Sequence, residues 1–160
     1  RNEWDAAFLL DVLEHIPDHE AALRQIQESL VPGGTLFVTV PALQAFWSWN
    51  DEVAHHQRRY RRKDFVTLAR STGFQLVDAR YFMFFLSPLL FATRWLSRGG
   101  MRPEMTAEEK ARLVAKTHAT PSPIVNGALK AIFAAETPIG HLVKFPWGTS
   151  LLAILRKPSE

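Results

Sequence analysis

The sequence contains no cysteine, which excludes disulfide-stapled folds and metal centres built from thiolates. Its 19 basic and 16 acidic residues leave a formal net charge of only +3, so a broad nucleic-acid-binding face would need strong local clustering of basic residues. Internal repeats and low-complexity stretches are also lacking. What remains is a chain of 160 residues, 47% of them hydrophobic, which is enough to form one domain around its own core.

Hydrophobic runs long enough to span a membrane are scarce. The uncharged run Tyr81–Thr93 has thirteen residues, whereas a bilayer-spanning helix needs about 20. Two interpretations stay open: a buried or dimer-forming helix, or an interfacial helix that meets a membrane or a lipid-like acceptor, with Trp95, Arg94 and Arg98 at the level of the lipid headgroups. We therefore expect a cytoplasmic protein that forms a homodimer or contacts the membrane peripherally through residues 81–98.

The stretch Asp5–Pro41 has the pattern of a strand, a helix and a second strand. Ala6–Leu10 is a short apolar run, typical of a buried strand. Asp18 is the predicted N-cap of a helix whose apolar residues recur at spacings of three and four. The β-branched and aromatic residues of Thr35–Val40 predict the next strand. A unit of this length predicts a right-handed crossover between two parallel strands.

Charged side chains follow the first predicted strand directly. Asp11, Glu14 and His15 lie where open α/β sheets bind ligands, beyond the carboxyl end of a parallel strand. If a helical turn begins there, these three side chains share one side, and His56 could complete the set. Two carboxylates and two imidazoles suit Mg²⁺, Mn²⁺ or Zn²⁺. In the alternative interpretation Glu14 and His15 form local hydrogen bonds and Asp11 caps the following turn.

Four motifs occur in order along the first half of the chain. They are Asp-x-x-Glu-His-Ile at 11–16, Leu-x-Pro-Gly-Gly at 30–34, His-Gln-Arg-Arg-Tyr at 56–60 and Ser-Thr-Gly-Phe at 71–74. Together they resemble the second half of a class I S-adenosylmethionine-dependent methyltransferase, over about residues 4–83 and more loosely over the final strand at 149–156.

The resemblance implies an α/β fold: a partial Rossmann-like methyltransferase sheet, mostly parallel, with an antiparallel last strand inserted between two earlier ones, plus a helical insertion. It divides the chain into core strand–helix–strand units at 1–83, a helical insertion at 84–148, and the last strand and tail at 149–160. The glycine-rich loop and the acidic residue of the family's first half do not occur here, and neither Gly33-Gly34 nor Gly99-Gly100 follows a strand and opens a helix. We expect a C-terminal part of a longer protein that is inactive by itself.

The same resemblance implies S-adenosylmethionine as cofactor, with Leu10, Asp11 and Glu14 on its binding side. Methyl transfer to a hydroxyl or amine needs positioning and removal of a proton, which an imidazole can accept near neutral pH. We therefore predict His56 and His15 as catalytic bases, with His56 favoured because its loop should face the acceptor. The charged set at 11–15 with His56 also resembles the Glu-x-x-Glu-His…His metal sites of some small-RNA and quinone-pathway methyltransferases, with Asp11 in place of the first Glu.

Residues 42–62 are predicted to form a loop, or a short helix and a loop, on the acceptor side. Trp47 would form part of a lid or a hydrophobic wall, and Arg58, Arg59 and Tyr60 would bind substrate, because guanidinium groups suit anionic acceptors. A solvated basic face is the alternative. We expect methyl transfer to a small-molecule or lipid-linked acceptor, on oxygen; the alternatives are an RNA methyltransferase, suggested by the basic run up to Lys63, and a non-catalytic membrane-associated or dimerising fragment.

The remaining elements are predicted from periodicity and from proline and glycine positions. The predicted elements are a helix at 64–72 closed by Gly73, a strand at 74–83, a linker at 99–103, an exposed helix at 106–116 with a Thr106–Glu109 capping box, a helix at 124–135 with Ile124, Leu129, Ile132 and Phe133 on its apolar side, an irregular segment at 137–148 and a final strand at 151–155.

Overall fold

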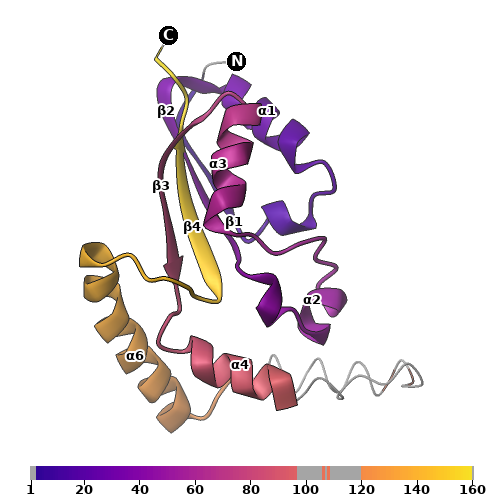
Figure 1. The fold of residues 1–160 in the computed structure, drawn as a ribbon, viewed down its shortest axis with the longest axis vertical. Helices are drawn as coiled ribbons and strands as arrows, with labels where there is room; N and C mark the ends of the chain where they lie inside the picture. The colour runs from indigo at the N-terminus through magenta and orange to yellow at the C-terminus, as the bar shows by residue number, and fades with distance from the viewer. Residues whose placement is uncertain (1–2, 97–105, 107, 109–119, 160) are drawn as a thin grey trace.

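A four-stranded sheet organises the chain. The computed structural model describes residues 3–96, 106, 108 and 120–159. Within them the strands β1 (Trp4–Leu10), β2 (Leu30–Pro41), β3 (Gln75–Phe82) and β4 (Ser150–Arg156) lie in the order β1-β2-β4-β3 (Figure 1). β1 pairs with β2 in parallel, and β4 runs antiparallel to both of its neighbours. The predicted partial Rossmann-like sheet, with its inserted antiparallel last strand, is confirmed.

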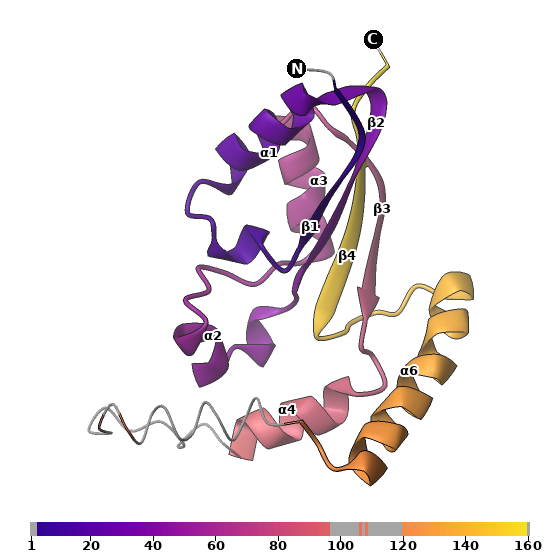
Figure 2. The same cartoon turned by 180° about the vertical axis from the view of Figure 1, so that it is seen from behind.

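Helices α1 (His19–Ser29) and α3 (Arg62–Ser71) lie together on one side of the sheet, as Figures 1 and 2 show. The Asp18 carboxylate accepts a hydrogen bond from the backbone N–H of Ala21 (2.9 Å), so the predicted N-cap is confirmed. Gly73 follows α3 with φ of +76°, a left-handed conformation suited to a glycine at this position. The core lies between these helices and the sheet; it includes Leu23, Leu36, Val38, Val40, Phe65, Leu68, Leu151, Ala153 and Leu155.

Three short elements connect the strands to the helices at the carboxyl ends of β1 and β2. The 3₁₀ turn η1 (Leu13–His15) follows β1, while η2 (Gln44–Phe46) and α2 (Trp49–Val53) follow β2. The segment after β2 is therefore a short helix and loops, one of the two forms expected from its sequence.

Helix α6 (Pro123–Leu142) continues beyond the predicted end at residue 135. The irregular structure expected from residue 137 onward is therefore wrong for residues 137–142, although Pro138 removes one backbone donor inside the helix. Tertiary hydrogen bonds support the last turns: Arg80 donates to the carbonyl oxygens of Gly140 (3.1 Å) and His141 (3.2 Å). The carboxylate of Glu136 also accepts hydrogen bonds from the backbone N–H groups of Phe84 and Phe85.

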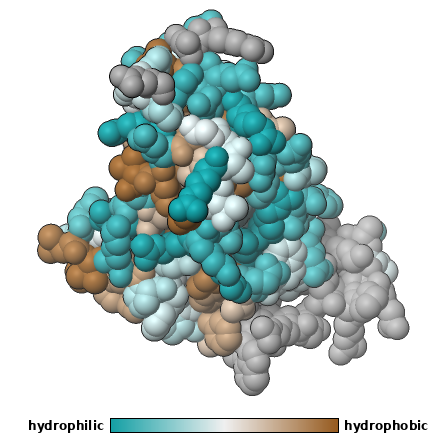
Figure 3. Space-filling model, turned by 45° about the horizontal axis from the view of Figure 1, so that its top comes forward, coloured by the Kyte–Doolittle hydropathy of each residue, from teal (hydrophilic) through white to brown (hydrophobic). Residues whose placement is uncertain are grey.

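On the part of α4 (Ser87–Leu96) whose side chains the structure describes, residues 87–93, two large apolar residues are exposed and Leu90 is half-buried. Leu89 is 58% exposed and Phe91 43% exposed, so burial of this helix inside the domain is not observed. On α6, Leu129 and Ile132 are partly buried but Ile124 is exposed. Figure 3 shows separate hydrophobic patches at the margins of a mostly hydrophilic face. Among the described helices, none combines the length and apolar character needed to cross a bilayer. The predicted linker at 99–103 and the helix at 106–116 lie outside the described residues.

The face of the sheet opposite α1 and α3 is open along β1. Phe8 is 64% exposed although its ring stacks on Phe37, with centroids 5.0 Å apart, and Leu10 is 57% exposed. Strands of parallel sheets are normally covered on both faces. The described residues thus leave an apolar strip of the sheet available for packing by further structure.

Asp78 ties β3 to the segment between α6 and β4. Its carboxylate accepts hydrogen bonds from Lys144 Nζ (2.6 Å) and from the guanidinium of Arg80. Burial alone would raise the pKa of Asp78, but the hydrogen bonds from Lys144 and Arg80 outweigh it and lower the pKa below its ordinary value. The stabilisation from the ionised carboxylate is therefore present above the unfolded-state pKa and is lost as the pH falls through the lower folded-state pKa.

Asp78→Asn is expected to lower the free energy of unfolding by about 1 kcal/mol at pH 7. The difference from the wild type should shrink as the pH falls below about 4, where the unfolded carboxyl begins to protonate. Urea denaturation at neutral and acidic pH measures both effects, with Asp5→Asn as the control for an exposed carboxylate. A difference independent of pH would show that the carboxylate charge is not the stabilising feature.

Candidate functional site

Three of the polar side chains singled out in the sequence converge at the carboxyl end of β1. Glu14 and His15 come from η1, and His56 comes from the loop after α2. One oxygen or nitrogen of each of these three side chains lies within 4.8 Å of those of the other two, and we call this group the polar cluster. Nε2 of His15 lies 4.0 Å from a Glu14 oxygen, and the rings of His15 and His56 meet edge to face with centroids 4.7 Å apart.

Hydrogen bonds to backbone carbonyl groups of η1 hold the two segments of the polar cluster together. Gln57 donates its backbone N–H to the carbonyl oxygen of Glu14 (2.8 Å), and the hydroxyl of Tyr60 donates to the carbonyl oxygen of Leu13 (3.3 Å). Leu13 itself is fully buried in the core. The polar cluster is therefore assembled by the fold and does not depend on bonds among its own side chains.

Glu14 is an unusual carboxylate. It is only 1% exposed, and its Oε2 has no hydrogen-bond partner among the described residues. Burial raises the pKa of Glu14, and the negative charge of Asp11 adds to this effect; a backbone hydrogen bond and the nearby His56 and His15 oppose it but do not cancel it. An unsatisfied buried polar atom costs roughly 1–3 kcal/mol, and such atoms are often found at functional sites.

Asp51, which was not among the site residues predicted from the sequence, lies behind His56. One oxygen of its buried carboxylate is 2.9 Å from Nδ1 of His56, and Arg59 binds both oxygens, at 2.8 and 3.1 Å. Burial raises the pKa of Asp51, but the hydrogen bonds from Arg59 and His56 outweigh it, so the pKa lies below its ordinary value. The available sequence signal was Ser48-x-x-Asp51, which forms the capping box of α2.

The residues predicted to bind substrate lie in different environments. Arg59 is buried against Asp51, and Tyr60 is buried with its hydroxyl 2.8 Å from Nδ1 of His19. Burial raises the pKa of Tyr60 to about 12. These two side chains therefore make structural contacts in the core, and their role in substrate binding stays a prediction. Arg58 is partly exposed and donates to the carbonyl oxygen of Pro17 (2.9 Å), and Trp47 is partly buried; both stay predicted acceptor-side residues.

Asp11 lies at the end of β1 but does not belong to the polar cluster. It is exposed, with φ of +53°, and its backbone N–H donates to the carbonyl oxygen of Thr39 (2.9 Å). The four-residue metal set expected from the sequence is therefore reduced to Glu14, His15 and His56 among the described residues. Leu10 and Asp11 instead form an exposed apolar–acidic pair at the strand end.

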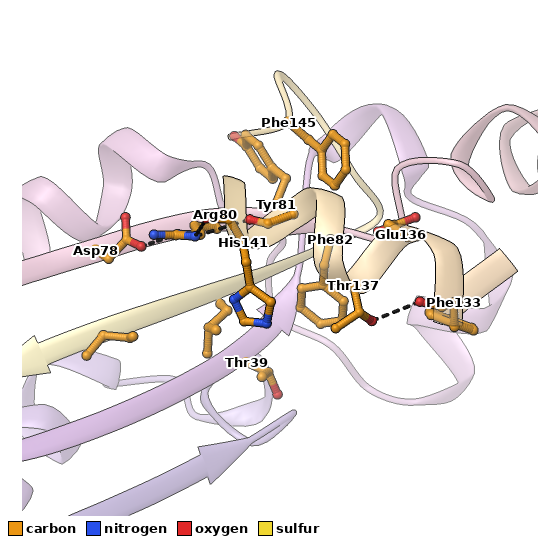
Figure 4. A pocket seen from close by; sticks show the side chains of 13 residues that line it. Thr39, Asp78, Arg80, Tyr81, Phe82, Phe133, Glu136, Thr137, His141 and Phe145 are labelled. Carbon is orange, nitrogen blue, oxygen red and sulfur yellow. Dashed lines mark hydrogen bonds and ion pairs between the residues drawn. The ribbon is translucent and has the colours of Figure 1, made fainter. Parts of the chain in front are cut away.

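A cavity of about 440 Å³ lies elsewhere, between α6 and the sheet face opposite α1 and α3. Figure 4 shows His141 and Thr137 extending from α6 over the strands, with Thr39 on the sheet side. The cavity lining is mainly apolar, including Phe133, Leu152 and Ile154, and contains no member of the polar cluster. We place the candidate active site at the polar cluster, because the titratable groups with a perturbed buried carboxylate meet there.

Comparison with known proteins finds a family match in the first half of the chain. The model of a family described as "Methyltransferase domain" matches residues 1–79. Residues 1–79 belong to this methyltransferase domain family. The matched part contains the whole polar cluster together with Asp51 and Arg59, whereas α4 and α6 lie outside it. A sequence search of curated proteins finds no match.

Solved structures share the fold of this methyltransferase domain. The [4+2]-cyclase SpnF has a TM-score of 0.52 at 20% identity, over 99% of this chain and 51% of that one. Phosphoethanolamine N-methyltransferase 2 of Haemonchus contortus, in complex with S-adenosyl-L-methionine, has a TM-score of 0.52 at 17% identity, over 98% and 34%. A SAM-dependent methyltransferase from Archaeoglobus fulgidus has a TM-score of 0.50 at 12% identity, over 98% and 60%. The chain therefore spans about one third to three fifths of the length of these structures.

Proposed function

We propose that this chain forms the acceptor-side part of an S-adenosylmethionine-dependent methyltransferase in which His56 removes a proton from the acceptor. The observation that carries the proposal is the convergence of Glu14, His15 and His56 at the carboxyl end of β1, inside the part matched by the methyltransferase model. In open α/β sheets this edge is where ligands bind. The proposed acceptor is a small-molecule or lipid-linked compound methylated on oxygen.

The residues at the end of β1 suit one side of a cofactor site. Leu10 offers exposed apolar surface, and the exposed carboxylate of Asp11 is an acceptor for hydroxyl or ammonium groups. When bound, S-adenosylmethionine supplies a methyl group activated on a sulfonium sulfur. The open strip at Phe8 and Leu10 supports the further proposal that another part of the protein packs there and completes the site.

His56 is the proposed base because one of its ring nitrogens is already occupied. Nδ1 is hydrogen-bonded to Asp51, so Nε2 is the nitrogen available to accept a proton from an acceptor hydroxyl. His15 lies against the ring of His56 and restricts its position.

Asp11→Ala is expected to weaken binding of S-adenosylmethionine to the full protein by about tenfold, equivalent to about 1.4 kcal/mol. Isothermal titration calorimetry with S-adenosylmethionine and S-adenosylhomocysteine measures the effect. Asp5→Ala, at the start of the same strand, is the matched control and should bind normally. Failure of the unmodified full protein to bind either compound would refute the proposed function.

The polar cluster also supports a divalent metal ion as a second candidate cofactor. Glu14 Oε2 is buried and unpartnered within the described chain, and two imidazoles lie beside it, a donor set that suits Mn²⁺ or Zn²⁺ better than Mg²⁺. A bound ion would increase the acidity of an acceptor hydroxyl. Glu14, His15 and His56 would be its ligands.

A lipid-linked acceptor is the finer part of the proposal. Phe85, Leu89 and Phe91 expose apolar side chains on and just before α4, which supports contact of residues 81–98 with a membrane surface at the cytoplasmic side. The same exposed side chains would suit a homodimer contact.

A further inference from the structure

We infer that Asp51 is a positioning residue that fixes the orientation and tautomer of the His56 ring. The inference rests on the proposed function in one respect, the role of His56 as base, and extends it to a residue outside the polar cluster. The position of the His56 ring proton itself does not depend on which reaction the protein catalyses.

The contacts of Asp51 leave one role for Nδ1 of His56. Oδ1 accepts a hydrogen bond from Nε of Arg59 (2.8 Å) and lies 2.9 Å from Nδ1 of His56. Oδ2 accepts from Nη2 of Arg59 (3.1 Å) and from the backbone N–H of Ser48 (2.8 Å). An ionised carboxylate only accepts hydrogen bonds, so Nδ1 must carry the proton and neutral His56 must have its lone pair on Nε2.

The carboxylate itself cannot turn away from the ring. Arg59 donates hydrogen bonds to both oxygens of Asp51 and to the carbonyl oxygen of Ala42 (3.1 Å), just beyond β2. Both Asp51 and Arg59 are buried, which favours a single arrangement of the pair. The position of the base is therefore anchored to the end of the sheet.

The backbone turn after α2 places the His56 ring over this carboxylate. His55 adopts φ of +56°, a conformation that non-glycine residues rarely adopt, and the backbone N–H of His56 donates to the carbonyl oxygen of Asp51 (2.8 Å). The adjacent Gln57 is bonded to the backbone of Glu14. The ring is thus held between Asp51 and η1 before any acceptor binds, as expected for a preorganised base.

The competing explanation is that Asp51 only neutralises the buried Arg59. That role requires the Asp51–Arg59 pair but predicts no preference between the two tautomers of His56. Replacing both members of the pair by uncharged residues, Asp51→Asn with Arg59→Met, removes the carboxylate without leaving a buried charge unpaired. The Asn side chain can donate to Nδ1, which would favour the opposite tautomer.

The test is ¹⁵N NMR of the histidine rings in the full protein, labelled on histidine, at mildly alkaline pH where imidazole is neutral. The proposal predicts a protonated Nδ1 and an unprotonated Nε2 for His56 in the wild type. In the double variant the proton should move to Nε2. The single variant Asp51→Glu keeps a carboxylate and should therefore retain the wild-type signals in part. Glu52→Gln, an exposed neighbour, is the control and should change nothing.

The kinetic counterpart is a fall in kcat of about 10- to 100-fold in the double variant with KM little changed. A wild-type His56 protonated on Nε2, or ring signals that do not respond to loss of the Asp51 carboxylate, would overturn the inference. If the tautomer changes as expected but the full protein neither binds S-adenosylmethionine nor transfers methyl groups, the positioning of His56 stands and the proposed function fails.

Discussion

His56→Gln is expected to lower the rate of methyl transfer by roughly 10²- to 10⁴-fold, the usual contribution of a positioned general base. Glutamine approximates the size and polarity of the imidazole but cannot accept the proton. The fold should be retained, because the ring is only partly buried and the backbone of this loop is held by the Gln57–Glu14 hydrogen bond. The measurement is kcat with saturating S-adenosylmethionine in the full protein.

His55→Asn is the matched control for this variant. His55 is exposed, and asparagine tolerates its left-handed backbone conformation. We expect near-normal activity from this control. A fully active His56→Gln protein would remove His56 both as base and as metal ligand.

Removal of metal separates the two roles of His56. If His56 acts only as a base, treatment with EDTA leaves the wild-type rate unchanged. If it acts as a ligand with Glu14, EDTA abolishes activity, Mn²⁺ or Zn²⁺ restores it, and Glu14→Gln weakens metal binding measured by calorimetry.

Arg59→Met is expected to lower the free energy of unfolding by about 3–5 kcal/mol, because it leaves the Asp51 carboxylate buried without its main partner. Urea denaturation at neutral pH measures this change. Arg58→Met, at the neighbouring partly exposed position, should change the free energy by about 0.5–1 kcal/mol at most. A role of Arg59 in substrate binding would instead raise KM and leave the stability unchanged.

The same pair predicts non-additive energetics. Asp51→Asn combined with Arg59→Met should be more stable than Arg59→Met alone, because no charge is left buried without a partner. If the double variant were as unstable as the sum of the single ones, the contact between Asp51 and Arg59 would not be the stabilising feature.

The strand and helix pattern of the first half was predictable because its signals are local. The apolar run at Ala6–Leu10, the N-cap at Asp18 and the β-branched run at Thr35–Val40 each depend on neighbours within a few residues. The extension of α6 through Pro138 was not predictable in this way. It depends on Arg80 and on the Phe84–Phe85 backbone, more than fifty residues away in the chain.

The sequence by itself determined the sheet, its crossover, and the presence of charged residues where the first strand ends, because periodicity, capping and the four ordered motifs are encoded over short distances. Only the tertiary structure decided which of those residues meet. It separated Asp11 from the polar cluster, buried Arg59 and Tyr60, and placed Asp51 behind His56. The physical reason is that the partner of a buried charge is set by loop packing and by backbone hydrogen bonds between distant segments, for which residue spacing carries no signal.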